Sequence, residues 1–183
     1  MKASAIALLL VTVSFFPQSI LAVSGDNASH LFFIERSKNR NLVQYDVRLT
    51  DNRDLPDSSP VHAYWILENG GREELNSLEK KYAYGIVRQE KLAEDKLRVI
   101  LAAFKSLEII VEKMNDSFKP VVFINGRESN LQKIYIKSEE KAKGLPKVLY
   151  IDLFGRTKKT GLLMKERIHP DPVSQYREVE RIK

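Results

Sequence analysis

The sequence contains no cysteine among its 183 residues. This absence excludes disulfide bonds, a thiolate nucleophile and cysteine-ligated metals, and it excludes lipid attachment through an N-terminal cysteine. The fold must therefore be stabilised by packing alone. About 160 residues remain once an N-terminal export signal is set aside. A chain of that length buries roughly two-thirds of its unfolded surface and needs no covalent cross-link.

Histidine is scarce, and the common catalytic motifs are missing. The three histidines, His30, His62 and His169, are far apart, and neither H-E-x-x-H nor G-x-S-x-G occurs. The segment 155–161 (GRTKKTG) lacks the order of a nucleotide-binding loop, and the aspartates of 51–57 lack calcium-hand spacing. The sequence therefore predicts no metal site, no cofactor and no nucleic acid partner, and it assigns no catalytic residue.

Only one long hydrophobic run is present, at the N-terminus. Lys2 precedes an apolar stretch over 3–16, and small residues follow up to Ser24. This pattern predicts a signal peptide over 1–24, cleaved after Ala22 or Ser24. The run is shorter than the roughly 20 residues of a membrane-spanning helix, so we expect no membrane span after cleavage. We expect an exported protein, periplasmic or extracellular, and a bacterial one, because small secreted eukaryotic domains more often carry disulfides.

The chain also has only a small excess of one sign of charge. The formal net charge is +6, and it becomes +5 (29 basic minus 24 acidic residues) when Lys2 leaves with the signal peptide. Acidic and basic residues alternate along the chain. Such a mild excess serves solubility, or it attracts an anionic envelope surface or polyanion.

The dominant pattern that is present is a period of two, which predicts β-strands. In 42–49, for example, Val43, Tyr45 and Val47 share one face while Gln44 and Asp46 share the other. The same alternation places the odd-numbered residues of 61–67 on the core face, and it places Leu131 on one face with Lys133 and Tyr135. We expect a flexible leader over 25–30, a single β domain over 31–170 and a charged tail over 171–183. The strands that we expect are 31–36, 42–49, 61–67, 86–92, 97–104, 107–114, 121–125, 131–137, 148–154 and 162–168. About nine to ten short strands without α/β alternation predict an all-β fold, a single antiparallel β-sandwich or barrel.

One short helix interrupts this pattern. Leu75, Leu78 and Tyr82 recur at helical spacing, and Asn76 followed by Glu79 has the pattern of a capping box. We therefore expect a helix over 76–83, with Gly85 as its C-cap glycine.

The segment 64–85 also holds the candidate ligand-binding site. It gathers Tyr64, which points away from the core, and Tyr84, at the junction with the next strand, with charged and amide side chains. Trp65, the only tryptophan, is expected in the core. Aromatic rings with convergent polar groups are typical of surfaces that bind sugars and other amphipathic ligands. With the turn that follows the first strand, the candidate residues are Tyr64, Arg72, Glu73, Glu74, Asn76, Tyr84, Arg36 and Asn39.

Four segments resemble a known family in combination. They are IERSKN (34–39), VxxYWI (61–66), REELN (72–76) and YAYG (82–85). Together they are similar to a family of secreted bacterial proteins known only as a domain of unknown function, over roughly 31–170. The resemblance implies a single exported bacterial domain and transfers no activity, substrate or catalytic residue.

These features support a hypothesis with two alternatives. We expect an exported binding domain of the bacterial cell envelope, whose partner is an envelope ligand or protein. The first alternative is an enzyme that uses Glu73, Glu74 or Glu79 as carboxylates on an envelope polymer. The second is an accessory protein that docks on a partner through a sheet edge. The sequence leaves open whether the protein is an enzyme and what its oligomeric state is.

Overall fold

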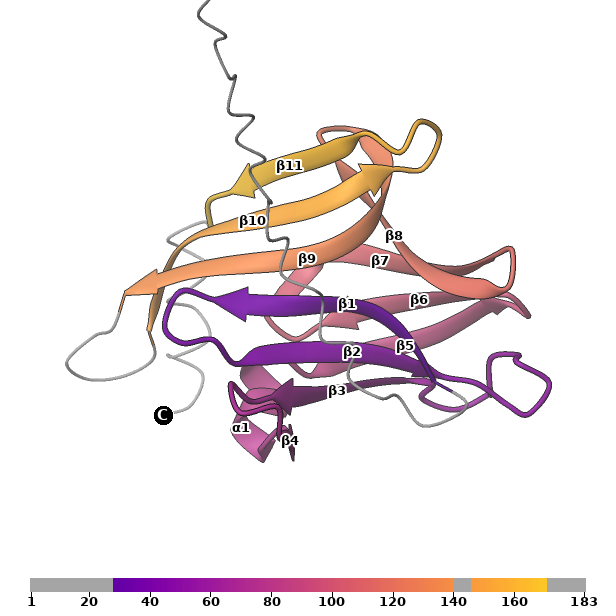
Figure 1. Cartoon of the computed structure of the whole chain (residues 1–183), viewed down its shortest axis with the longest axis horizontal. Coiled ribbons are helices and arrows are strands. Elements are labelled where there is room, and N and C mark those ends of the chain that lie inside the picture. Colours follow the sequence, from indigo (N-terminus) through magenta and orange to yellow (C-terminus); the bar gives the residue numbers. More distant parts are fainter. Residues whose placement is uncertain (1–27, 140–145, 171–183) are drawn as a thin grey trace, which may run out of the picture.

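The computed structural model describes residues 28–139 and 146–170. The described residues form eleven strands and one helix (Figure 1). They are β1 (Ala28–Arg36), β2 (Leu42–Arg48), β3 (Val61–Ile66), β4 (Arg72–Glu74), α1 (Ser77–Tyr82), β5 (Ile86–Ala93), β6 (Lys96–Leu101), β7 (Phe104–Met114), β8 (Ser117–Ile124), β9 (Arg127–Glu139), β10 (Lys147–Thr157) and β11 (Leu163–Ile168). The all-β fold class is confirmed.

The strands join in one large sheet that is not closed into a barrel. Its main path runs β4-β3-β2-β1-β9-β8-β7-β6-β5, and β10 pairs with both β9 and β11. The barrel alternative is therefore wrong.

The prediction of a purely antiparallel sheet is wrong at one junction. β1 runs parallel to β9, from Phe33 opposite Lys133 to Arg36 opposite Ile136. This pairing is possible because β8 covers β9 only from Arg127 to Asn130, which leaves the rest of that edge free for β1. β10 pairs along the other edge of β9.

The sheet folds over into two layers around one core (Figure 1). β1, β2, β3, β9, β10 and β11 lie nearer the viewer, and β5, β6 and β7 lie behind them. One hydrophobic cluster contains buried residues of both layers, among them Phe32, Ile34, Val43, Tyr45, Trp65, Val99, Val111, Phe118, Ile134 and Leu153. The inward faces that the period-two pattern assigned to β2 and β3 are confirmed, including the burial of Trp65 at 6% exposure.

Several boundaries differ from the prediction. Residues 28–30, which we expected in the leader, belong to β1. The connection left between the expected strands 107–114 and 121–125 is shorter, because Asn115 takes a positive φ and β8 begins at Ser117. The connection between 148–154 and 162–168 is shorter too, since β10 extends to Thr157. β4 was not among the expected strands. The predicted signal peptide and C-terminal tail lie outside the described residues.

The prediction of which face of the sheet Leu131 occupies is wrong, and the cause is clear. Leu131 was expected on the same face as Lys133 and Tyr135, yet it is buried, as are Ile134 and Ile136. The register against β10 slips at this point, so that Leu131 and Lys133 pair with adjacent residues and Gln132 is the extra residue of a bulge. A bulge reverses the alternation of faces on either side of it.

Helix α1 begins as predicted and ends differently. The capping box is confirmed: the Asn76 side chain accepts from the Glu79 backbone, and the Glu79 side chain accepts from the Asn76 backbone. Gly85 is not a left-handed cap, and the C-cap is Ala83. A glycine is required at 85 because a Cβ there would lie 1.8 Å from the carbonyl oxygen of Lys80. Leu78, expected on a buried face, is 70% exposed.

Candidate functional site

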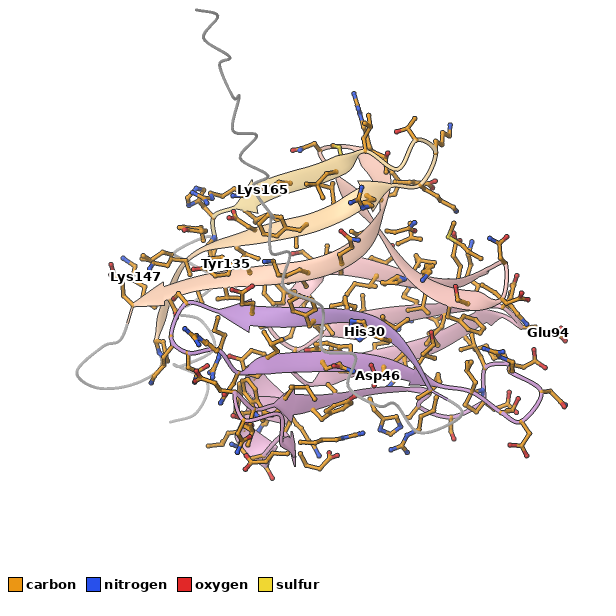
Figure 2. The ribbon with its side chains drawn as sticks, viewed as in Figure 1. His30, Asp46, Glu94, Tyr135, Lys147 and Lys165 are labelled. Carbon is orange, nitrogen blue, oxygen red and sulfur yellow. The ribbon has the colours of Figure 1, made fainter. Side chains whose placement is uncertain are left out.

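The front layer presents a polar and aromatic surface to solvent, which we call the outer face. It consists of the side chains that point away from the core on β3, β2, β1, β9, β10 and β11. Residues directly opposite each other on paired strands share a face. Two adjacent rows of such residues cross the layer: Tyr64, Gln44, Phe33, Lys133, Phe154 and Lys165 form one, and Ile66, Leu42, Glu35, Tyr135, Asp152 and Arg167 form the other. Figure 2 shows His30, Asp46, Tyr135 and Lys165 spread over this layer.

A buried carboxylate organises the end of these rows on β10 and β11. Arg167 donates two hydrogen bonds to Asp152, from Nε to Oδ1 at 2.7 Å and from Nη2 to Oδ2 at 2.8 Å. Lys165 Nζ lies 2.8 Å from Asp152 Oδ2. The hydrogen bonds from Arg167 lead the effects that lower the pKa of Asp152 to about 2. The Asp152 side chain is 4% exposed, whereas Lys165 and Arg167 are 49% and 43% exposed.

Aromatic rings lie between these cations. The Phe154 ring has Lys133 Nζ at 4.8 Å and Lys165 Nζ at 5.3 Å from its centroid. The Arg167 guanidinium lies 3.7 Å from the centroid of Tyr150, whose ring also neighbours Tyr135 at 6.4 Å. Cations at these distances are attracted to the negative faces of the rings.

A second buried carboxylate, Asp46, lies on the β2 part of the same face. It accepts hydrogen bonds from the Tyr64 hydroxyl and, at 2.9 Å, from Gln44 Nε2, and His30 Nδ1 lies 3.1 Å away. Burial opposes ionisation, but the hydrogen bonds from His30, Tyr64 and Gln44 outweigh it, so the pKa of Asp46 is lowered. Burial, followed by the bond to Asp46, raises the pKa of Tyr64. Asp46 is therefore a fixed acceptor and Tyr64 a fixed donor, which does not suit them to acid–base work near neutral pH.

The network also positions a cation. The Arg72 guanidinium of β4 lies 3.5 Å from the centroid of the Tyr64 ring. Tyr64 is 2% exposed, because Arg72 covers it from the solvent side. The outer face thus carries cation–aromatic contacts at both of its ends.

Around Arg36 a different cluster lies on the core side of β3, near α1. The Arg36 guanidinium stacks on the Trp65 ring at 4.4 Å and lies 5.8 Å from the Tyr84 ring. Arg36 Nη2 donates to Asn39 Oδ1 at 3.3 Å. Trp65 Nε1 donates to Glu79 Oε2 at 3.0 Å.

The eight predicted site residues therefore do not form one site. Tyr64 belongs to the outer face and Arg72 covers its ring from β4, whereas Arg36, Asn39 and Tyr84 belong to the cluster around Trp65. The division follows from strand geometry, because Tyr64 and Trp65 are neighbours on β3 and point to opposite faces. The remaining three lie on the β4–α1 edge, where Glu73 and Glu74 are exposed and Asn76 caps the helix.

The carboxylates named for an enzyme are not arranged as a catalytic pair. Glu73 and Glu74 are adjacent on an edge strand and point to opposite sides of it. Glu79 is committed to the Asn76 backbone and to Trp65. Within 28–139 and 146–170 there is no group of three or more His, Asp or Glu side chains that could hold a metal ion. In the same ranges no helix has the length and apolar character to cross a membrane.

Most residues of the outer face escaped sequence analysis. The alternation of Lys133 with Tyr135, of Asp152 with Phe154 and of Lys165 with Arg167 is visible in the sequence. What is not visible is that β1 joins β9, which continues the row of Lys133 to Phe33 and the row of Tyr135 to Glu35.

Fold and surface together define an all-β domain with an open sheet and an aromatic, cationic face. The domain of unknown function DUF4833 matches residues 32–167, and the chain belongs to this family. The predicted membership in a family of unknown function is thereby confirmed. No curated protein and no solved structure matches the chain.

Proposed function

We propose that this DUF4833 protein is an exported binding domain of the bacterial cell envelope that holds an anionic polysaccharide on its outer face. Export rests on the signal-peptide pattern of residues 1–24 and on the absence of cysteine. The ligand class rests on the chemistry of the outer face.

One observation carries the proposal. At the β10–β11 end of the outer face the acidic group is buried and the cations beside it are exposed: Asp152 lies beneath Lys165 and Arg167, which reach the solvent next to Tyr150 and Phe154. A ligand that approaches this surface meets positive charge and aromatic rings first. Such a surface attracts an anion and offers flat apolar area to stack on.

The extent of the face favours a polymer over a small molecule. Its rows are continuous across six strands, from Tyr64 to Lys165. With neighbouring strands about 4.8 Å apart, six strands span roughly 24 Å, which is longer than one sugar ring and suits an extended chain. Sugar rings have apolar faces for the aromatic side chains, and acidic substituents would reach the cations.

The proposal is tested by binding to an immobilised polymer with and without charge. We expect the protein to bind polygalacturonate, and to bind its methyl ester, which has the same backbone without the charges, at least tenfold more weakly. The affinity should fall as salt is added, because exposed ion pairs are screened. Single-stranded oligothymidylate is the third arm, since aromatic and cationic surfaces also bind nucleic acid.

Matched variants locate the surface. Phe154→Ala and Arg167→Ala should each weaken binding about fivefold to tenfold, as expected for the loss of one cation–aromatic contact of about 1 kcal/mol. Phe123→Ala and Lys119→Ala are the controls, because both residues are exposed on β8, which contributes no side chain to the rows of the outer face. Equal losses in the controls, or tighter binding of the oligothymidylate, would contradict the proposal.

A further inference from the structure

Arg36 is a charged residue without a charged partner. It makes no ion pair within the described residues, although it is partly buried at the C-terminal end of β1, next to the packed core. A partly buried cation without a counter-charge is costly unless something compensates it. The aromatic cluster around Arg36 supplies part of that compensation.

The guanidinium is held flat by rings that are themselves fixed. It stacks on Trp65 at 4.4 Å, and Trp65 and Tyr84 meet edge to face at 5.2 Å. Glu79 accepts the indole N–H of Trp65, and the buried Tyr45 donates its hydroxyl to the Tyr84 carbonyl at 2.6 Å. Stacking occupies the flat face of a guanidinium and leaves its N–H groups, which lie in the plane, for hydrogen bonds.

Those N–H groups are poorly satisfied. Arg36 Nη1 reaches the Tyr84 hydroxyl at 3.4 Å and Nη2 reaches Asn39 Oδ1 at 3.3 Å, both beyond the usual hydrogen-bond range of about 2.7–3.2 Å. Arg36 Nε is buried and has no hydrogen-bond partner. The Arg36 guanidinium is thus held in place, but the protein's own acceptors do not fully use its N–H groups.

We propose that Arg36, with Asn39 and Tyr84 beside it, binds the carboxylate of a small ligand. A planar carboxylate matches the fork of a guanidinium and can accept two parallel hydrogen bonds from it. One negative charge also balances the single charge of Arg36. A phosphate dianion would leave one charge uncompensated near Glu79, so the site favours a monocarboxylate. The inference does not depend on the outer face, since Trp65 and Tyr64 point to opposite sides of β3.

Trp65 reports on this site directly. It is the only tryptophan in the chain, and the guanidinium lies on its ring, so a ligand that moves Arg36 changes its fluorescence. We expect glucuronate, as a sugar acid, and N-acetylglutamate, as an amino-acid carboxylate, to change the emission saturably. The tighter of the two identifies the source of the carboxylate. Sodium chloride at equal ionic strength should have no saturable effect.

Variants separate binding from folding. Arg36→Lys keeps the positive charge but loses the two parallel N–H donors of the guanidinium, and it should weaken binding at least tenfold. Asn39→Ala leaves Arg36 stacked on Trp65 and should weaken binding severalfold. Arg40→Gln is the matched control, because Arg40 is 85% exposed and forms its ion pair with Glu68 at the surface. Thermal midpoints near that of the wild type show that these variants fold.

Three results would overturn the assignment. They are the absence of a saturable emission change with either carboxylate, an equal affinity in Arg36→Lys and the wild type, and phosphate binding more tightly than both carboxylates.

Discussion

At the scale of single residues, the outer face has two buried carboxylates with exposed cations close to them. The carboxylates of Asp46 and Asp152 are 5% and 4% exposed, and the cations and aromatic rings beside them lie above. A buried carboxylate is tolerated only when hydrogen bonds satisfy it, and both have such bonds. Each therefore acts as a fixed hydrogen-bond acceptor that orients the polar side chains beside it.

Asp152→Asn tests this positioning role through pH. The pKa of Asp152 in the folded protein is about 2, below its ordinary value of 3.8. Because the folded pKa is the lower one, its stabilisation is complete above pH 4 and is lost as the pH falls towards 2. We expect the variant to be less stable than the wild type by about 1 kcal/mol at neutral pH. The difference should shrink as the pH falls below about 4 and should vanish only below about pH 2.

Urea unfolding at a series of pH values measures this difference. Asp57→Asn is the control, because the Asp57 side chain is 97% exposed and its pair with Lys91 contributes little. If the wild type and Asp152→Asn differ by the same amount at every pH, then the carboxylate does not stabilise the protein as an ion.

At the scale of elements, α1 shows which sequence signals are local. The capping box needs only Asn76 and Glu79, three positions apart, and it formed as predicted. The apolar spacing held only in part: Leu75, just before the helix, is buried and Tyr82 is half-buried, but Leu78 is exposed. The six residues of the helix bury no side chain, and the helix is attached through its cap and through Glu79 to Trp65. The glycine at 85 was recognised as special for the wrong reason, since the constraint is the nearby backbone of Lys80.

For Asn76→Ala the sequence pattern and the structure predict the same loss of stability, whereas for Leu78→Ala they differ. Loss of the cap should destabilise the protein by about 0.5–2 kcal/mol. Loss of the exposed Leu78 side chain should change stability by less than about 0.5 kcal/mol. Chemical denaturation followed by Trp65 fluorescence measures both, and a larger loss for Leu78→Ala would show that the helix packs through its apolar residues.

At the scale of the whole molecule, the sequence predicts strands better than it predicts their neighbours. Alternation in 42–49 and 61–67 identified the inward side chains, because the apolar residues of one face recur at every second position within each strand. The pairing of β1 with β9 brings together Glu35 and Lys133, which are 98 positions apart, and no local pattern encodes it. The bulge at Gln132 also depends on the partner strand. The outer face is a product of these pairings, so it could not be assembled from sequence alone.

Mapping of amide chemical shifts by NMR tests the central claim most directly. A uniformly labelled protein is titrated with a short oligogalacturonate. We predict that the perturbed amides gather on the outer face, at Phe33, at Lys133 and Tyr135, and over 150–154 and 165–167, while those of 119–123 on β8 stay unchanged. Perturbations centred on β5, β6, β7 or β8, or none at saturating ligand, would contradict the account.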